Sequence, residues 1–179
     1  MSSRATVAQQ PPAPGLDLSR FPDDSAGVHS DMYSRAHTKP YDAHWRSSSG
    51  EGRFDLPAPE GTCYVAETTE VAVREWLGPA GTKGFATQDD CDRLQVTIFD
   101  HIACRAALVS VPAAAPYGIT SELTTMTPYD TPQAWARALR AAGFEAIRYA
   151  PRFTPGGAPA VALFGPAGAG KVGEELRRI

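Results

Sequence analysis

The sequence predicts a single compact domain of the α+β (mixed α/β) class, preceded by a loose N-terminal segment. Three observations support this prediction. The chain has 179 residues, enough for one hydrophobic core and too few for a second full domain. Hydrophobic residues make up 42% and charged residues 21%, as in ordinary globular proteins. The later half of the chain predicts strand, helix, strand and strand, without any internal repeat, and this order fits a mixed domain.

The two ends of the chain differ in composition from its middle. Residues 1–27 mix Pro, Gln, Ser and Gly with few large apolar groups, so burial cannot offset the entropy lost on ordering, and we expect them to be loose. Within them, Leu16, Leu18 and Phe21 could dock on the domain as a short strap. We expect the domain to span 28–166 and residues 167–179 to form a C-terminal tail.

The first predicted elements are a strand and a helix. Residues 62–66 (TCYVA) are β-prone and follow a Pro-Glu-Gly turn, which predicts a short strand. Residues 71–77 predict a short helix, because Thr68 or Thr69 offers an N-cap oxygen and a Gly-Pro pair beginning at Gly78 ends it.

The middle of the chain predicts a further strand and one ambiguous segment. Residues 93–99 (RLQVTIF) alternate well enough for a strand that places three apolar side chains on one face: Leu94, Val96 and Ile98. Residues 103–111 are mostly apolar, and their pattern is ambiguous between a strand and a helix.

The clearest predicted helix covers residues 132–142. Thr131 is the expected N-cap, Pro132 the first helical residue and Gly143 the residue that ends the helix. Trp135, Leu139 and Ala142 would share one face. Residues 146–150 and 160–164 then predict two strands around a Pro-Gly turn.

A glycine motif follows the last predicted strand. Residues 165–171 spell G-x-x-x-x-G-K, the pattern of a phosphate-binding P-loop. Val172 stands where Ser or Thr would supply a hydroxyl to magnesium, and only seven residues remain after it. The overlapping G-x-G-x-x-G from Gly168 has no room for the acidic residue that a dinucleotide fold needs some 20 positions later. We therefore expect no nucleotide loop here.

Composition also excludes several classes of protein. The net charge of −3 argues against a long nucleic-acid footprint, although a local basic pocket for a small anion remains compatible with it. No apolar run approaches the roughly 20 residues that cross a bilayer, and the N-terminus has no apolar signal core. The expectation is therefore a cytoplasmic protein that binds neither membrane nor nucleic acid directly.

The cysteines and histidines predict neither a disulfide framework nor a metal site. The three cysteines are an odd number without a C-x-x-C pair, which indicates a reducing compartment. His101 and Cys104 have a spacing that suits a metal, but two ligands are too few for zinc, and we expect them to pack in the fold.

Polar and aromatic side chains gather between Arg35 and Glu75, at predicted turns and element ends, where functional groups are commonly placed. Three of the four histidines lie in this stretch or just before it (His29, His37 and His44). The remaining members of this set are Arg35, Lys39, Tyr41, Trp45, Arg46, Arg53, Tyr64 and Glu75.

The order of short motifs in this stretch resembles the RES-domain family. R-A-H-T-K-P-Y is followed by G-E-G-R-F-D, G-T-C-Y-V-A and V-A-V-R-E-W, and later by A-I-R-Y-A-P-R-F and A-V-A-L-F. The similarity covers roughly Met32 to Gly165. It implies an ADP-ribosyltransferase-like fold that acts on NAD⁺ as a substrate, without a cofactor. Many members are toxins, paired with an Xre-type antitoxin protein that covers the active site.

The residues can be matched to that chemistry. Cleavage of the nicotinamide–ribose bond passes through an oxocarbenium-like transition state, which a carboxylate such as Glu75 can stabilise. Arginine binds pyrophosphate oxygens in pairs, and Tyr64 can stack on nicotinamide. We take Glu75, Arg35 and Tyr64 as the catalytic candidates. The substrate-binding candidates are Arg53, His37, Lys39, Tyr41 and Arg152.

The same residues could also have purely structural roles. Arg53 could only tie a turn to the core, Tyr64 could be a strand residue with a bonded hydroxyl, and Glu75 could be a solvated helix residue beside Arg74. His37 and His44 fit structural or surface roles better than catalytic ones.

One position departs from the family pattern. The family commonly carries Ser in a closing Y-x-S-R motif, and here Pro151 stands at that place, with neither a hydroxyl nor a backbone N–H to donate. Thr154 could supply the missing hydroxyl. The sequence thus predicts an NAD⁺-cleaving enzyme that passes ADP-ribose to water, phosphate or a protein. The alternative is a non-catalytic module that binds NAD⁺ or ADP-ribose, or that docks a partner.

Overall fold

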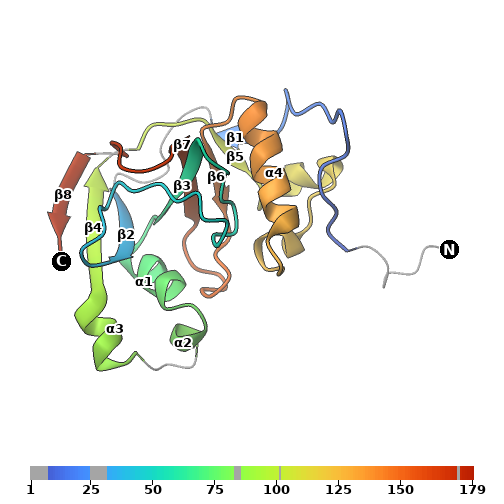
Figure 1. The fold of residues 1–179 in the computed structure, drawn as a ribbon. Helices are drawn as coiled ribbons and strands as arrows, with labels where there is room; N and C mark the ends of the chain where they lie inside the picture. The colour runs from blue at the N-terminus through green and yellow to red at the C-terminus, as the bar shows by residue number, and fades with distance from the viewer. Residues whose placement is uncertain (1–7, 25–31, 83–85, 101, 173) are drawn as a thin grey trace.

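The fold is built on one mixed β-sheet, flanked by helices (Figure 1). The computed structural model describes residues 8–24, 32–82, 86–100, 102–172 and 174–179. In this part of the chain the strand order is β1-β5-β6-β7-β3-β2-β4-β8, and neighbours are antiparallel except for β5 and β6. The strands are β1 (Asp23–Asp24), β2 (Met32–Thr38), β3 (Glu60–Ala66), β4 (Leu94–Asp100), β5 (Ala106–Leu108), β6 (Ala146–Tyr149), β7 (Ala160–Pro166) and β8 (Glu174–Arg178).

The helices lie in two groups along this sheet (Figure 1). The first group is α1 (Thr69–Leu77), α2 (Pro79–Thr82) and α3 (Gln88–Arg93). The second is the connection from β5 to β6, with the 3₁₀ helices η2 (Pro112–Tyr117) and η3 (Ser121–Thr124) followed by α4 (Asp130–Ala141). The α+β class is confirmed, as are the strands predicted over 62–66, 93–99, 146–150 and 160–164 and the helix over 71–77. The ambiguous residues 103–111 contain the short strand β5.

The two faces of the sheet carry separate cores, because side chains alternate along each strand. The larger core joins one face to α1, α4 and the 3₁₀ helices, and it contains Phe54, Trp135, Leu139 and Tyr149. The smaller core lies on the other face and contains Tyr33, Cys63, Val65, Phe99 and Leu163. Which core a strand residue belongs to therefore tells on which face of the sheet it lies.

The helix α1 begins and ends as its sequence predicts. Thr68 is the N-cap, and its hydroxyl accepts a hydrogen bond from the N–H of Val71. Gly78 ends the helix with a φ of 55°. Ser34 of β2 pairs with Thr69 through their hydroxyl oxygens, 2.8 Å apart, so α1 is joined to the sheet at its first residue. This contact places α1, and with it Glu75, on the face of the sheet that carries Ser34.

The start of α4 differs from the prediction. The helix begins at Asp130 after Tyr129, so Thr131 is not its N-cap and Pro132 is its third residue. Pro is compatible with this place because the N–H groups of a first helical turn have no partner within the helix. Gly143 follows the end of the helix with a φ of 88°, as predicted. Trp135 and Leu139 are buried on the face toward the larger core.

The N-terminal segment is held against the domain at several points in its described residues. Leu18 and Phe21 belong to the larger core, and Leu16 packs against it, so the predicted strap forms. Gln9 is bound to the 3₁₀ region, where its side-chain oxygen accepts the N–H of Thr120 at 2.7 Å. Asp23 and Asp24 then form β1 against β5. The expectation of a loose segment therefore does not hold for residues 8–24, because a few well-placed apolar and amide side chains hold them.

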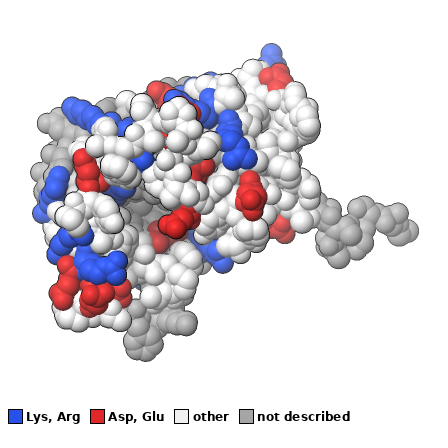
Figure 2. Space-filling view, in the orientation of Figure 1, with Lys and Arg blue, Asp and Glu red and all other residues white. Residues whose placement is uncertain are grey.

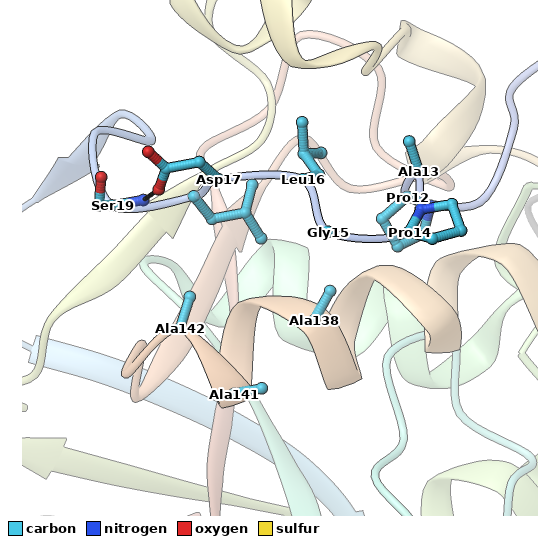
Figure 3. A pocket seen from close by; sticks show the side chains of 11 residues that line it. Pro12, Ala13, Pro14, Gly15, Leu16, Asp17, Ser19, Ala138, Ala141 and Ala142 are labelled. Carbon is cyan, nitrogen blue, oxygen red and sulfur yellow. Dashed lines mark hydrogen bonds between the residues drawn. The ribbon is translucent and has the colours of Figure 1, made fainter.

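A groove of about 590 Å³ separates this segment from the later half of α4 (Figure 3). Ala138 and Ala142 point toward it from the helix, and the chain from Pro12 to Ser19 closes it on the opposite side. Small side chains on α4 leave this space open.

The end of the chain also joins the sheet. Residues 174–178, expected to belong to a tail, form β8 beside β4. The glycine motif at 165–171 precedes β8 and packs around the side chain of Arg46. A Cβ on Gly165 would lie 2.7 Å from Arg46 Nε, and Arg46 donates a hydrogen bond to the Lys171 carbonyl. A loop filled by a cationic side chain, and leading into a strand, is no P-loop.

Two further expectations concern residues that the structure covers only in part. His29 and His101 lie outside the described residues. Among the residues that are described, no three His, Cys, Asp or Glu side chains come together as a metal site would require. In the same part of the chain, every helix is too short or too polar to cross a membrane.

Candidate active site

Arg53 is almost buried, in the connection between β2 and β3. Its side chain is 8% exposed. One guanidinium nitrogen, Nη1, donates a hydrogen bond of 2.7 Å to the carbonyl of Met126, and the guanidinium carbon lies 4.7 Å from the centre of the Tyr129 ring. An arginine enclosed in this way has a fixed position, as binding of a phosphate group requires.

Glu75 projects from α1 toward the loop that follows β6. Its Oε1 accepts a hydrogen bond of 2.6 Å from the N–H of Phe153 and lies 3.5 Å from the Thr154 hydroxyl oxygen. Burial raises the pKa of Glu75 above its ordinary value, although these two groups, the N–H of Arg152 and the charge of Arg53 act to lower it. A half-buried carboxylate with a raised pKa is typical of active sites.

Tyr64 of β3 lies on the same face of the sheet. Its hydroxyl donates a hydrogen bond of 2.9 Å to Asp55 and accepts one of 2.8 Å from the N–H of Phe54. The ring packs against the larger core and remains partly exposed. Burial and the Asp55 carboxylate raise the pKa of Tyr64 well above its ordinary value, so the hydroxyl keeps its proton and its role as donor.

These side chains form one cluster, which we call the Glu75–Arg53 cluster and define as Arg53, Glu75, Tyr129, Tyr149, Arg152 and Thr154. The charges of Arg53 and Glu75 act on each other's pKa, and both act on that of the buried Tyr149. The elements that meet here are far apart in sequence: the β2–β3 connection, α1, the start of α4 and the end of β6.

Two grooves open beside the cluster. One, of about 390 Å³, runs between α1 and residues 154–158, and Thr154 is shared by groove and cluster. The other, of about 400 Å³, lies at the start of α4 and includes Tyr129. Basic and acidic side chains are interspersed over the face seen in Figure 2, without a long stripe of one sign. The setting suits a small charged ligand better than a polyanion.

Comparisons with known proteins identify the family and the fold. The family model of the RES domain matches residues 31–177. The chain belongs to the RES domain family. The match extends beyond residue 166, so β8 is part of the RES domain rather than a tail.

A solved structure has the same fold. It is the M. tuberculosis MbcT–MbcA toxin–antitoxin complex, which this chain matches with a TM-score of 0.66 and 12% sequence identity, over 86% of this chain and 85% of the other. At this identity the likeness shows the fold alone. No curated protein matches the sequence.

The structure places Arg35 of this RES domain on the opposite face of the sheet from Glu75. Its guanidinium donates hydrogen bonds to the Ala43 carbonyl and, at 3.1 Å, to the Cys63 sulfur, and both partners belong to the smaller core. Tyr64 and Ser34 alternate with Cys63 and Arg35 and face α1. Arg35 therefore does not join the Glu75–Arg53 cluster.

Of the remaining candidates, three lie outside the Glu75–Arg53 cluster and one belongs to it. His37 is buried on the Arg35 face, with Nε2 3.0 Å from the Thr97 hydroxyl oxygen. Lys39 is exposed and donates to the Asp92 carbonyl at 3.1 Å, and Tyr41 is 67% exposed on the loop after β2. Arg152 is in the cluster, with its guanidinium carbon 5.3 Å from the centre of the Phe153 ring. The cluster thus keeps Glu75, Arg53 and Arg152 from the predicted set, and Tyr64 lies beside it on the same face of the sheet.

Sequence reasoning missed four contributors. Asp55 directly follows the G-R-F motif, and its place two residues after Arg53 was the available signal. Tyr149 lies two residues after the buried Ile147 in the predicted strand 146–150 and shares its face, so this face could have been assigned. Tyr129 and the Met126 carbonyl come from an irregular segment with no periodic pattern, and only the three-dimensional fold brings them to Arg53.

The placement of Arg35 makes a testable difference. We expect Arg35→Ala to leave any reaction at the Glu75–Arg53 cluster unchanged and to lower the free energy of unfolding by about 1–3 kcal/mol, because the Ala43 carbonyl loses its charged donor. Urea unfolding and a turnover assay on the same preparation check this. A loss of turnover with unchanged stability would place Arg35 in the site after all.

Proposed function

We propose that this RES domain is an NAD⁺-consuming enzyme that cleaves the bond between nicotinamide and ribose, and that it acts as the toxin of a toxin–antitoxin pair. The observation that carries the proposal is Glu75: a half-buried carboxylate of raised pKa, oriented by the Phe153 N–H and set beside Arg53. Family membership supports NAD⁺ as the substrate class, and the likeness to a toxin–antitoxin complex supports the biological setting.

The reaction needs charge stabilisation more than a strong base. Nicotinamide leaves as a neutral molecule, and positive charge develops on the ribose as the glycosidic bond breaks. A carboxylate in a site of low dielectric stabilises such charge strongly when it is already oriented. The hydrogen bond from Phe153 fixes Oε1 of Glu75, so little reorganisation is needed when the charge appears.

Arg53 is the best placed residue for the pyrophosphate. It is fixed by Met126 and Tyr129, and Arg152 adds a second positive charge in the same cluster. A planar guanidinium can bind two phosphate oxygens at once, which aligns the ribose as well as holding the nucleotide. The partly exposed ring of Tyr64 remains available for stacking, although its hydroxyl is used within the protein.

Thr154 is our candidate for the hydroxyl that the family has in its closing motif. Pro151 occupies the Ser position, and three residues later the Thr154 oxygen lies 3.5 Å from Glu75 Oε1. In this position it could hold a ribose hydroxyl or the attacking acceptor close to the carboxylate. Water, phosphate or a protein side chain would then receive the ADP-ribose.

The second candidate function is a binding module without catalysis, and Pro151 is the specific observation in its favour. A binding module predicts that calorimetry detects binding of NAD⁺ and ADP-ribose, without turnover.

The decisive experiment incubates the purified chain with NAD⁺, with and without phosphate, and follows all products by mass. Free nicotinamide supports the enzyme, and the mass of the ribosyl product separates hydrolysis, phosphorolysis and transfer. Intact NAD⁺ that nevertheless binds would support the module.

The raised pKa of Glu75 predicts the pH dependence of turnover. The carboxylate must be ionised to stabilise positive charge, so kcat should rise with pH through a pKa above the ordinary value for glutamate. The effect on stability has the opposite sign: the folded state favours the protonated form, so this contribution to stability is lost as pH rises through that pKa. A pH–kcat profile checks the first statement, and an acid limb at the ordinary glutamate pKa would contradict it.

A further inference from the structure

The turn that carries Arg53 is held by one buried carboxylate. Asp55 is 2% exposed. Its Oδ2 accepts the N–H groups of Gly50 and Gly52 at 3.2 and 3.0 Å, and its Oδ1 accepts the Tyr64 hydroxyl at 2.9 Å. A carboxylate with several donors on both oxygens fixes the backbone that provides them. The residue just before Arg53 is therefore held by Asp55.

The residue just after Arg53 is held by β3. The N–H of Phe54 donates to the Tyr64 hydroxyl at 2.8 Å, and its carbonyl accepts from the Thr62 hydroxyl at 2.9 Å. The Phe54 ring is fully buried and packs edge-on against Tyr149, with 5.0 Å between the ring centres. Tyr64 thus connects the two halves of the turn, because one hydroxyl serves both Asp55 and Phe54.

The close packing of this turn explains the glycine that precedes Arg53. A Cβ on Gly52 would lie 2.2 Å from Asp55 Oδ1 and 2.5 Å from the Tyr64 hydroxyl oxygen, and both of those atoms belong to the hydrogen-bonded set. Gln133 of α4 closes the turn from outside by donating to the Gly52 carbonyl at 2.9 Å. The order Gly52-Arg53-Phe54-Asp55 is therefore one structural unit.

We propose that Asp55 is a positioning residue for Arg53, and that it acts through the Tyr64 hydroxyl and the 49–56 turn. This inference rests on the proposed function, since it assigns Arg53 to the substrate. Arg53 has a fixed neighbour on each side, and the hydrogen bond and the ring contact of its side chain are made at the tip, with Met126 and Tyr129. The backbone of the turn sets where this side chain starts, so a shift of the turn would move the guanidinium away from the partners that hold its tip.

The first test compares Asp55→Asn, Tyr64→Phe and the double variant. Each should weaken ADP-ribose binding and raise the KM for NAD⁺ by about tenfold to a hundredfold, since a displacement of about 1 Å in a site has effects of this size. kcat should change less, because Glu75 is held by other elements. The double variant should be no worse than the poorer single one, because both act through one hydrogen bond. Tyr64→Phe keeps the ring and the packing, and serves if Asp55→Asn fails to fold.

The second test separates positioning from general stability. In an Arg53→Ala background, Asp55→Asn and Tyr64→Phe should have no further effect on ADP-ribose affinity, although each should still lower the melting temperature. The matched control is Asp42→Asn, whose carboxylate accepts the His44 N–H at 2.8 Å in an exposed turn outside the cluster. An effect of Asp55→Asn on affinity that persists without Arg53 would overturn the proposal.

A third measurement does not depend on NAD⁺. The side-chain Nε–H resonance of Arg53 in ¹⁵N-labelled protein should shift or broaden in Asp55→Asn and Tyr64→Phe, and stay in place in Asp42→Asn. If the resonance moves but the wild-type chain neither binds nor cleaves NAD⁺, the positioning role holds and the proposed function fails. A resonance that is unchanged in both variants would refute the positioning role, whatever the substrate.

Discussion

Replacing Glu75 by Gln should lower kcat for NAD⁺ cleavage by about 10²- to 10³-fold, the usual cost of removing one oriented electrostatic group from an active site. Gln keeps an oxygen that can accept the Phe153 N–H, so the loop after β6 should stay in place. NAD⁺ affinity should be nearly unchanged, because the carboxylate acts on charge that appears only in the transition state. Single-turnover kinetics and calorimetry on the same protein check the two statements.

Glu70→Gln is the matched control for this prediction. Glu70 lies on the same helix, but it is exposed and pairs with Arg74 at 3.0 Å. An exposed i,i+4 pair contributes little, so this variant should keep both turnover and stability. Equal losses of kcat in the two variants would show that removing either carboxylate from α1 impairs turnover, and Glu75 would then have no special role.

Arg53→Ala should weaken binding of NAD⁺ and ADP-ribose by about 10- to 100-fold, corresponding to roughly 1.4–2.8 kcal/mol. It should also lower the free energy of unfolding by about 1–3 kcal/mol, because the Met126 carbonyl loses a charged donor and the Tyr129 ring loses its cation. Arg53→Lys should recover part of the stability but little of the affinity, since an ammonium lacks the planar fork. Calorimetry and urea unfolding measure the two effects.

Arg105→Ala tests whether the loss of affinity is specific. Arg105 likewise has one polar partner and one ring contact, with an ion pair to Asp23 at 2.8 Å and its guanidinium carbon 4.2 Å from the centre of the Phe144 ring. It belongs to the β1–β5 edge of the sheet, outside the cluster. This variant should lose stability and keep full affinity. A similar loss of affinity in both variants would mean that Arg53 acts by stabilising the fold.

Local sequence signals were sufficient for most of the elements. Thr68 and Gly78 mark the two ends of α1, and both residues act as the pattern predicts, because capping depends on groups within a few residues. Thr131 is not the cap of α4, because the helix begins two residues earlier than predicted, directly after Tyr129. The Tyr129 ring contacts Arg53, a long-range contact that leaves no signal in the local sequence. The strap of Leu18 and Phe21 was visible as isolated apolar residues, but the hydrogen bonds of Gln9 that hold its beginning were not.

The site was predicted in part, and the reason is the alternation along strands. Arg35 and Tyr64 both come from strands near Glu75, yet a shift of one residue places a side chain on the other face. The motif order located Arg53, Tyr64 and Glu75 without telling which face each would occupy. Register decides that Arg35 points toward Cys63, and register is set by the pairing of β2 with β3 and β4.

The most direct test is a time course of nicotinamide release from NAD⁺ by the wild-type chain, Arg35→Ala and Glu75→Gln, measured in parallel at equal concentration of folded protein. A site at the Glu75–Arg53 cluster predicts release by the wild type and by Arg35→Ala, and almost none by Glu75→Gln. Release by Glu75→Gln at the wild-type rate, with none by Arg35→Ala, would place the chemistry on the other face of the sheet and contradict the assignment.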